Sequence, residues 1–128
     1  MTREILFRGK RVNNGEWVEG SYWYSRRSNT YQHFVFDDEG VWVGVDPNTV
    51  GQFTGLTDRN GVKIFEGDIV RYGDTIHRVV FEQRNGTAYF GLVYAACETL
   101  PFGHYQDLKQ IEVIGNVYDN PELLEVSE

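Results

Sequence analysis

The sequence has a single cysteine, Cys97, among 128 residues, so no intrachain disulfide can form. A lone thiol is typical of proteins in a reducing compartment. No apolar run approaches the roughly 18 residues that a membrane-spanning helix needs. The first eight residues, Met1 to Arg8, also lack the apolar core of a signal peptide. We therefore expect a cytoplasmic protein with no membrane partner.

Motifs of the common enzyme classes are missing as well. The chain has no glycine-rich loop before a helix, no Walker lysine and no Gly-x-Ser-x-Gly elbow, which argues against nucleotide hydrolysis and serine-hydrolase chemistry. His33, His77 and His104 are isolated from one another and from Cys97, and their spacing matches no metal motif. The sequence therefore predicts no metal and no cofactor.

Three carboxylates leave one catalytic hypothesis open. Asp46, Glu66 and Asp68 flank a glycine-rich stretch, and they would form an acidic cluster if its two ends met. The alternative is structural, because an Asp before Pro is a common turn former and Asp68 precedes a strand pattern, where it can accept from nearby backbone amides. Catalysis is the weakest of the function classes, and we assign no catalytic residue.

Aromatic and glycine residues are abundant. Eight Tyr, eight Phe and three Trp make 15% of the chain aromatic, and there are 14 Gly. Strand formers combined with turn formers favour sheet over helix. A length of 128 residues is typical of one domain, so we expect residues 1–128 to form a single domain.

Short β-branched and aromatic runs, bounded by Asn, Asp, Gly or Ser, predict strands along the whole chain. The first three, over residues 17–24, 31–36 and 40–45, predict one meander. Asn-Gly pairs at 14–15, 60–61 and 85–86 are strong hairpin signals, because a type I′ turn needs positive φ at both central residues. Further strands are predicted at 64–65, 68–72, 76–82, 88–94 and 111–117.

Helix is predicted only near the end, where Asn120 would cap a turn that begins at Pro121. The run of short strands after Glu66-Gly67-Asp68 resembles a small, bent SH3-like barrel, with a possible sub-barrel over 62–118. The predicted fold class is therefore mainly β, with antiparallel hairpins, an SH3-like barrel in the C-terminal half and one short C-terminal helix.

Residues 46–70 place four glycines among short apolar runs, so we expect the backbone to turn repeatedly there and to need φ > 0 at several positions. The segments 50–56, 58–61, 64–70 and 114–124, together with the opening 3–11 and 15–20, resemble the YopX family over nearly the whole chain. The candidate motif residues are Gly51, Gln52, Thr54, Gly55, Asp58, Gly61, Glu66, Gly67, Asp68, Gly115 and Asn116. The resemblance implies a mainly β protein of a phage or prophage, acting in a bacterial host cell, with self-association and no catalytic residues to carry over.

Charge is distributed unevenly. Residues 1–36 hold six basic and three acidic side chains, whereas residues 98–128 hold one basic and seven acidic ones, within a chain of net charge −7. The basic start of one subunit could pair with the acidic end of another. Overall acidity disfavours nucleic acid.

The basic start is also rich in aromatics, which is the pattern of single-strand binders. Its candidate residues for binding a nucleic acid or a protein are Arg8, Arg11, Trp23, Arg26 and Arg27. Alternation over residues 17–24 leaves neither side cleanly polar, which favours a protein interface over an open nucleic-acid platform. The sequence thus predicts a homo-oligomeric accessory protein that works by binding, with nucleic-acid binding as the alternative and an enzyme third.

Overall fold

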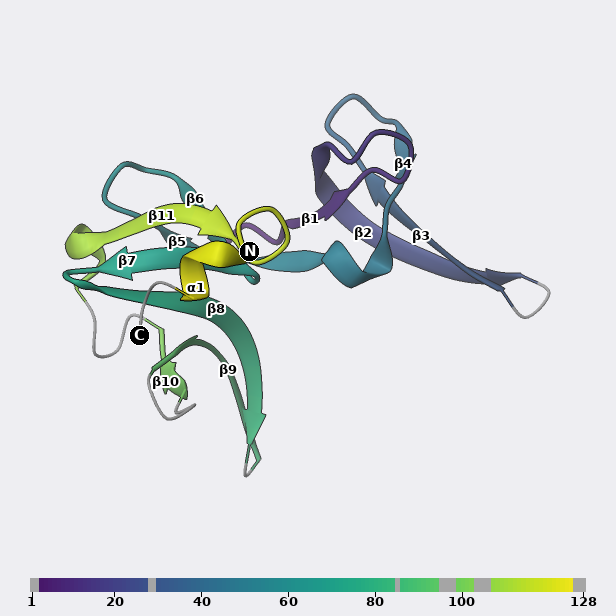
Figure 1. Cartoon of the computed structure of the whole chain (residues 1–128). Coiled ribbons are helices and arrows are strands. Elements are labelled where there is room, and N and C mark those ends of the chain that lie inside the picture. Colours follow the sequence, from purple (N-terminus) through teal and green to yellow (C-terminus); the bar gives the residue numbers. More distant parts are fainter. Residues whose placement is uncertain (1–2, 28–29, 85, 95–98, 103–106, 126–128) are drawn as a thin grey trace. The chain divides into compact units, whose positions relative to one another are not determined.

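The computed structural model describes residues 3–27, 30–84, 86–94, 99–102 and 107–125. Over these residues the chain consists mostly of antiparallel strands with one short helix, which confirms the mainly β class, the antiparallel pairing and the short C-terminal helix (Figure 1). The chain divides into two compact units, Met1–Phe53 and Thr54–Glu128, called the N-terminal and the C-terminal unit below. Within the described ranges, we find no helix with the length and apolarity needed to cross a membrane.

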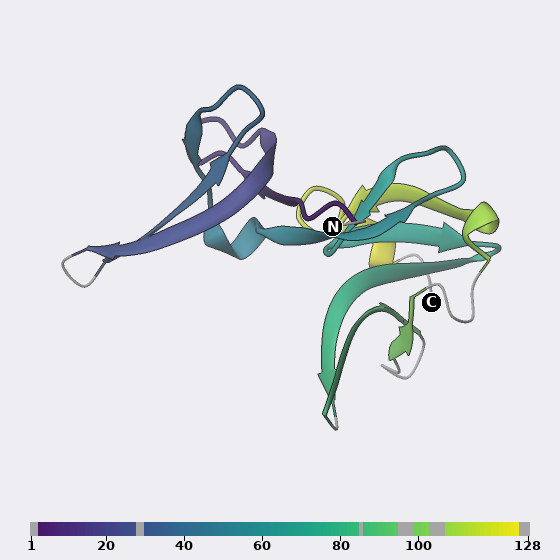
Figure 2. The ribbon, with the colours of Figure 1, turned by 180° about the vertical axis from the view of Figure 1, so that it is seen from behind.

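The N-terminal unit is a meander of four strands. These are β1 (Phe7–Lys10), β2 (Trp17–Arg27), β3 (Thr30–Phe36) and β4 (Trp42–Gly44), in the order β4-β3-β2-β1, each antiparallel to its neighbour. The three strands predicted between residues 17 and 45 are confirmed. Strands β2 and β3 form a long hairpin, which is seen from behind in Figure 2.

The core of the N-terminal unit is small and made of valines. Val18 of β2, Val35 of β3 and Val43 of β4 lie on one side of the meander, and Val45 joins them. After β4, the 3-10 turn η1 (Pro47–Thr49) begins at Asp46, whose carboxylate accepts from the Asn48 amide at 3.0 Å. This side of the sheet is the buried one, so the side chains at the intervening positions face away from the core.

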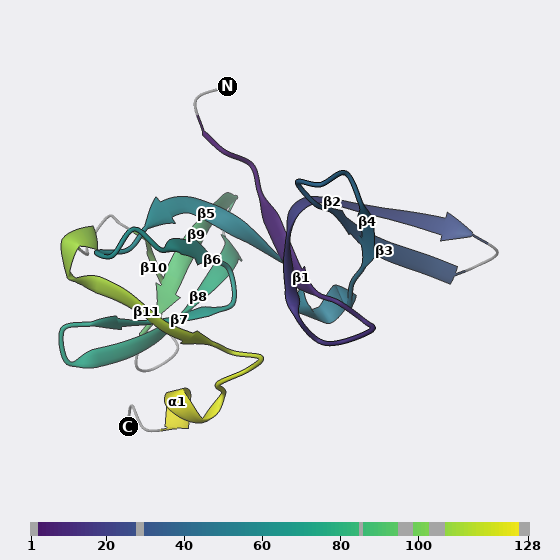
Figure 3. The ribbon, with the colours of Figure 1, turned by 90° about the horizontal axis from the view of Figure 1, so that it is seen from above.

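The C-terminal unit holds a bent five-stranded sheet. Its strands are β7 (Asp68–Tyr72), β8 (Thr75–Arg84), β9 (Thr87–Val93), β10 (Thr99–Pro101) and β11 (Ile111–Asn116), in the order β10-β9-β8-β7-β11. Strands β8 and β9 curve together (Figure 1). The 3-10 turn η3 (Leu108–Gln110) leads into β11. The helix α1 (Glu122–Glu125) comes after β11 in the chain (Figure 3). The core contains Ile64, Val70, Val79, Leu92 and Ile111.

The glycine-rich stretch departs from expectation in its first half. Residues Gly51–Thr57 form strand β5, which pairs with β1 through Gly51 and Gln52 and precedes the short strand β6 (Lys63–Phe65). No strand was predicted over residues 51–57, whereas the turns expected within residues 46–70 lie before this strand, at η1, and after it, at residues 58–61. Gly55 has φ +87° inside the strand, so the glycine kinks an extended segment instead of ending it. The positive φ values expected in this region occur at Gly55, Gly61 and Gly67.

The one-turn helix at the C-terminal end is confirmed. The amides of Leu123 and Leu124 donate to the carbonyls of Asn120 and Pro121 at 3.1 and 3.2 Å. The Asn120 side chain accepts from the Asn116 amide at 3.3 Å, which ties the helix start back to the end of β11. A Cβ at Gly115 would lie 2.6 Å from the Asn120 Oδ1 atom, so only glycine leaves room for this contact.

Truncating a core residue of the C-terminal unit is expected to destabilise it. Ile64 is fully buried, so Ile64→Ala should lower the free energy of unfolding by about 2–5 kcal/mol through lost burial and a residual cavity. Ile5→Ala is the control, because Ile5 is 44% exposed and the change there should stay within about 0.5 kcal/mol. Urea denaturation monitored by circular dichroism measures both. Equal effects of the two substitutions would contradict this assignment of the core.

Candidate interaction face

Four aromatic side chains from three strands share one face of the N-terminal sheet. Trp23 of β2 is paired with Phe34 of β3, and Phe36 of β3 is paired with Trp42 of β4. Directly opposed residues of antiparallel strands point to the same side. We call this group of Trp23, Phe34, Phe36 and Trp42 the aromatic face.

The four rings contact one another. Trp42 lies at the centre, with ring centroids 4.8 Å from Phe36, 5.3 Å from Trp23 and 6.2 Å from Phe34. Its contacts with Trp23 and Phe34 are edge-to-face, at 61° and 83° between the ring planes. These are favourable geometries, and such pairs add about 0.5–1.5 kcal/mol each beyond burial. The cluster is therefore a fixed surface rather than a set of independent side chains.

Much of this surface is open to solvent. Trp42 is 54% exposed, Trp23 49% and Phe36 37%, although Val35 and Val43 on the other side of the same strands are buried. Soluble proteins rarely expose contiguous apolar surface, and where they do, the patch commonly marks a site of interaction. The sheet therefore buries one apolar side and presents a second one.

Two cations extend the aromatic face toward β1. The Cζ atom of Arg8 lies 4.6 Å and the Nζ atom of Lys10 5.6 Å from the ring centroid of Trp17, within cation–π range. Glu19 is the cross-strand partner of Arg8. Trp17 and Glu19 stand six and four residues before Trp23 on β2, so alternation puts them on the same side.

The opposite side of β2 carries a second set of rings. The Tyr22 hydroxyl is hydrogen-bonded to Nδ1 of His33, and the rings of Tyr22 and Tyr24 both stack on the His33 ring. Burial, and to a smaller extent the neighbouring Tyr24, raises the pKa of Tyr22 above its usual value. Tyr22 is thus a neutral phenol at physiological pH, which suits a structural contact and not a base.

The sequence-predicted binding residues are only partly brought together. Arg8 and Trp23 share the side of the aromatic face, whereas alternation places the exposed Arg26 on the other side of β2. Arg11 follows β1 and forms an isolated bridge with Val45. The side chain of Arg27 lies outside the described residues. Sequence reasoning singled out Trp23 but not Phe34, Phe36 or Trp42. Alternation along the predicted strands 31–36 and 40–45 was the signal that could have placed these three rings on one side.

Two of the three carboxylates of the catalytic hypothesis are engaged in local structure. Asp46 caps η1, and the buried Asp68 accepts from the Phe65 amide at 2.7 Å through Oδ2. Both contacts are of the turn-forming kind that the sequence left open as the alternative. His77 is held by Thr75 Oγ1 at 2.7 Å and by the Val93 carbonyl at 2.9 Å. Among the described residues, no group of three His, Cys, Asp or Glu side chains is placed to hold a metal ion, and Cys97 and His104 lie outside them.

In the C-terminal unit, one buried carboxylate joins the turn after β5 to β11. Asp58 Oδ1 accepts from the amides of Asn60 and Val62, at 2.8 and 2.9 Å, and Oδ2 accepts from the amide of Val113 at 2.9 Å. Burial alone would raise the pKa of Asp58, but these three amides and the adjacent Arg59 hold it below its usual value. The ionised carboxylate is therefore part of the folded structure.

The sequence model described as YopX protein matches residues 6–125, which is nearly the whole chain. The chain belongs to the YopX family. The crystal structure of protein EF1440 from Enterococcus faecalis is similar to this YopX chain, with a TM-score of 0.50 and 23% sequence identity over 96% of this chain and 99% of that one. At this identity the likeness shows the fold. No curated protein matches the chain.

Several of the candidate motif residues in the C-terminal unit lie in turns and in links between strands. Thr54 Oγ1 donates to the Ile64 carbonyl at 2.8 Å, which links β5 to β6. The Gly67 amide donates to the Val79 carbonyl at 2.9 Å and its carbonyl accepts from the Val117 amide at 2.8 Å. Asn116 Oδ1 accepts from the amides of Tyr118 and Asp119, at 3.0 and 2.9 Å. The side chains of Thr54 and Asn116 thus have structural contacts, and Gly67 has φ +94°, a conformation that favours glycine.

Replacing the Asp58 carboxylate should destabilise the protein in a pH-dependent way. Asp58→Asn puts an NH2 group against a backbone donor, so we expect a loss of about 1–3 kcal/mol in the free energy of unfolding at pH 7. The folded-state pKa of Asp58 is lowered, so its ionic contribution is present above the unfolded-state pKa and is lost as the pH falls through the folded-state value. The difference between wild type and variant should therefore shrink in acid.

Asp107→Asn is the matched control for Asp58→Asn. Asp107 is exposed and accepts from the Lys109 amide at 3.0 Å, so the substitution should cost less than about 1 kcal/mol. Denaturant unfolding between pH 7 and pH 3 measures both variants. A cost at Asp58 that does not change with pH would contradict the role given to its charge.

Proposed function

We propose that this YopX family member works by binding rather than by catalysis, and that it self-associates through the aromatic face. The observation that carries the proposal is the exposure of Trp23 and Trp42 within one packed cluster of four rings. Tryptophan is enriched at the energetic centres of protein interfaces, where its large ring area is removed from water. Covering these rings is the expected source of binding free energy.

A second copy of the chain is the occupant that the charges favour. Ser21, Ser25 and Gln32 share the side of the aromatic face by alternation and register, and none of them carries a charge. Each chain has a net charge of −7, so two copies repel at long range. The four rings and these polar neighbours carry no charge, so contact between them adds no repulsion of like charges. A two-fold contact would bury the same face of both copies.

Substituting the two exposed tryptophans should dissociate the assembly. We expect wild type to run at a discrete multiple of 14.8 kDa and the Trp23→Ser, Trp42→Ser double variant to run at 14.8 kDa, by light scattering after gel filtration. Phe81→Ser is the control, since Phe81 is 41% exposed but belongs to the C-terminal unit, and its mass should equal that of wild type.

The same experiment separates the aromatic contact from pairing between the basic start and the acidic end of neighbouring subunits. If charge pairing held the assembly, Arg8→Glu with Arg11→Glu would lower the mass and the tryptophan variant would not. That result, or a wild-type protein that is monomeric at high concentration, would contradict the proposal.

Nucleic-acid binding is the second candidate, and the cation–π contacts favour it. Arg8 and Lys10 lie over Trp17 on the side of the aromatic face, which combines cations with rings as single-strand binders do. This candidate predicts binding of labelled single-stranded DNA or RNA that weakens steeply with salt, and a shallower salt dependence for Arg8→Gln with Lys10→Gln. Fluorescence anisotropy measures both, and no binding at low salt would dismiss this function.

The proposal also covers the domain organisation and the biological setting of the protein. We take residues 1–128 as one YopX domain, since the family match runs through both compact units. The bent sheet supports closure of residues 62–118 into an SH3-like barrel. An accessory protein of a phage or prophage, acting in the cytoplasm of a bacterial host, is the setting that the family membership supports.

A further inference from the structure

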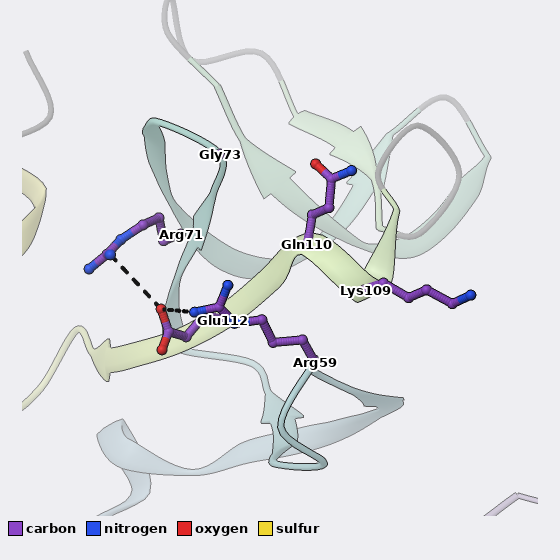
Figure 4. A pocket seen from close by; sticks show the side chains of 6 residues that line it. All are labelled: Arg59, Arg71, Gly73, Lys109, Gln110 and Glu112. Carbon is purple, nitrogen blue, oxygen red and sulfur yellow. Dashed lines mark ion pairs between the residues drawn. The ribbon is translucent and has the colours of Figure 1, made fainter.

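A cationic pocket of about 330 Å³ lies in the C-terminal unit, and neither the family match nor the proposed self-association uses it (Figure 4). Its lining comes from the turn after β5, from β7 and the turn after it, from η3 and from β11. The lining residues are Arg59, Arg71, Gly73, Lys109, Gln110 and Glu112. Three cations and one carboxylate give the pocket a local charge of +2 within an acidic chain.

The backbone that carries these cations is fixed. The Arg59 amide donates to the Ile111 carbonyl at 3.0 Å, next to the Asp58 carboxylate that joins the same turn to β11. Arg71 and Glu112 are direct partners in the pairing of β7 with β11. Lys109 stands in η3, whose first turn is closed by Asp107. The backbone positions that carry the three cations are therefore fixed before any ligand arrives, so binding does not have to order the backbone.

Glu112 brings the two arginines together. Its Oε1 atom lies 3.2 Å from Arg59 Nη2 and 3.9 Å from Arg71 Nη1. Figure 4 shows both guanidinium groups turned toward this carboxylate from opposite sides, while Lys109 extends away from it. One carboxylate oxygen uses few of the ten N–H donors of two guanidinium groups. The lysine ammonium makes no ion pair with any described residue, and its flexible stem allows it to reach an anion in the pocket.

We infer that this pocket binds the phosphate group of a small phosphorylated molecule that also carries hydroxyl groups. Paired arginines present planar forks of donors that match a phosphate, and a phosphate monoester carries about −1.5 to −2 charges at pH 7, which complements the local +2. The Glu112 carboxylate accepts a hydrogen bond from a hydroxyl group of the same ligand. A volume of about 330 Å³ suits a small molecule and is near the lower end of the range for such sites.

Half-exposed arginines set the expected strength of binding. The side chains of Arg59 and Arg71 are 50% and 51% exposed, so water and salt screen their charges. We therefore expect dissociation constants between micromolar and millimolar, and we expect binding to weaken with added salt.

NMR titration of the full chain tests the inference, with inorganic phosphate and ribose 5-phosphate as probes at constant ionic strength. Saturable shifts should appear at the amides of Arg59, Gly73 and Glu112, with ribose 5-phosphate binding several-fold more tightly than phosphate. Arg71→Gln should weaken both ligands at least tenfold. Arg78→Gln is the matched control, because it removes the same charge from an exposed position outside the pocket lining, and it should bind as wild type does.

Glu112→Gln gives the most specific readout. Removing the carboxylate raises the local charge, so inorganic phosphate should bind several-fold more tightly, while the preference for ribose 5-phosphate should disappear. Shifts that do not saturate, shifts that chloride reproduces, or equal effects of Arg71→Gln and Arg78→Gln would overturn the phosphate assignment. A ribose preference that survives Glu112→Gln would overturn the role of Glu112. The Trp23→Ser, Trp42→Ser variant should bind both probes unchanged, so this result stands apart from self-association.

Discussion

Alternation of side chains along an extended strand is the constraint on which the N-terminal unit depends. Because β2, β3 and β4 pair in register, each valine that enters the core fixes its neighbour on the outside. Val35 lies between Phe34 and Phe36, and Val43 follows Trp42, so the same pairing that buries the valines gathers the rings. The core and the aromatic face cannot form independently of each other. Exposed rings are thus a consequence of the register and not of a loose local structure.

In the C-terminal unit, a comparable role falls to the Asp58 carboxylate. It closes the turn after β5 on one side and accepts from β11 on the other, so it fixes the distance between two segments 55 residues apart in the chain. Arg59 follows it directly, and Glu112 precedes Val113, whose amide Asp58 accepts. The joint that stabilises this unit therefore also positions the cationic pocket. The stability of the C-terminal unit and the geometry of its cationic pocket therefore depend on the same backbone contacts.

The sequence predicts the strands with the clearest alternation and fails where local composition misleads. Residues 17–45 are β-branched and aromatic between turn formers, and all three of their predicted strands are present. Strand β5 was missed because glycine suggests turning, whereas its pairing with β1 keeps the chain extended. Trp23 was recognised but its partners were not, since cross-strand register decides which rings meet. The pocket had no local signal, because Arg59, Arg71 and Glu112 are brought together only by the β7–β11 pairing and by the turn that Asp58 holds.

The most direct test of the account is a dilution series of the wild-type protein that follows sedimentation mass and tryptophan emission together. Two of the three tryptophans belong to the aromatic face, so its burial must change their environment. We expect the mass to fall from an integer multiple of 14.8 kDa to a single subunit, with a red shift of the emission over the same concentrations. A mass that falls while the emission stays constant would show that subunits meet elsewhere and would contradict the role of the aromatic face.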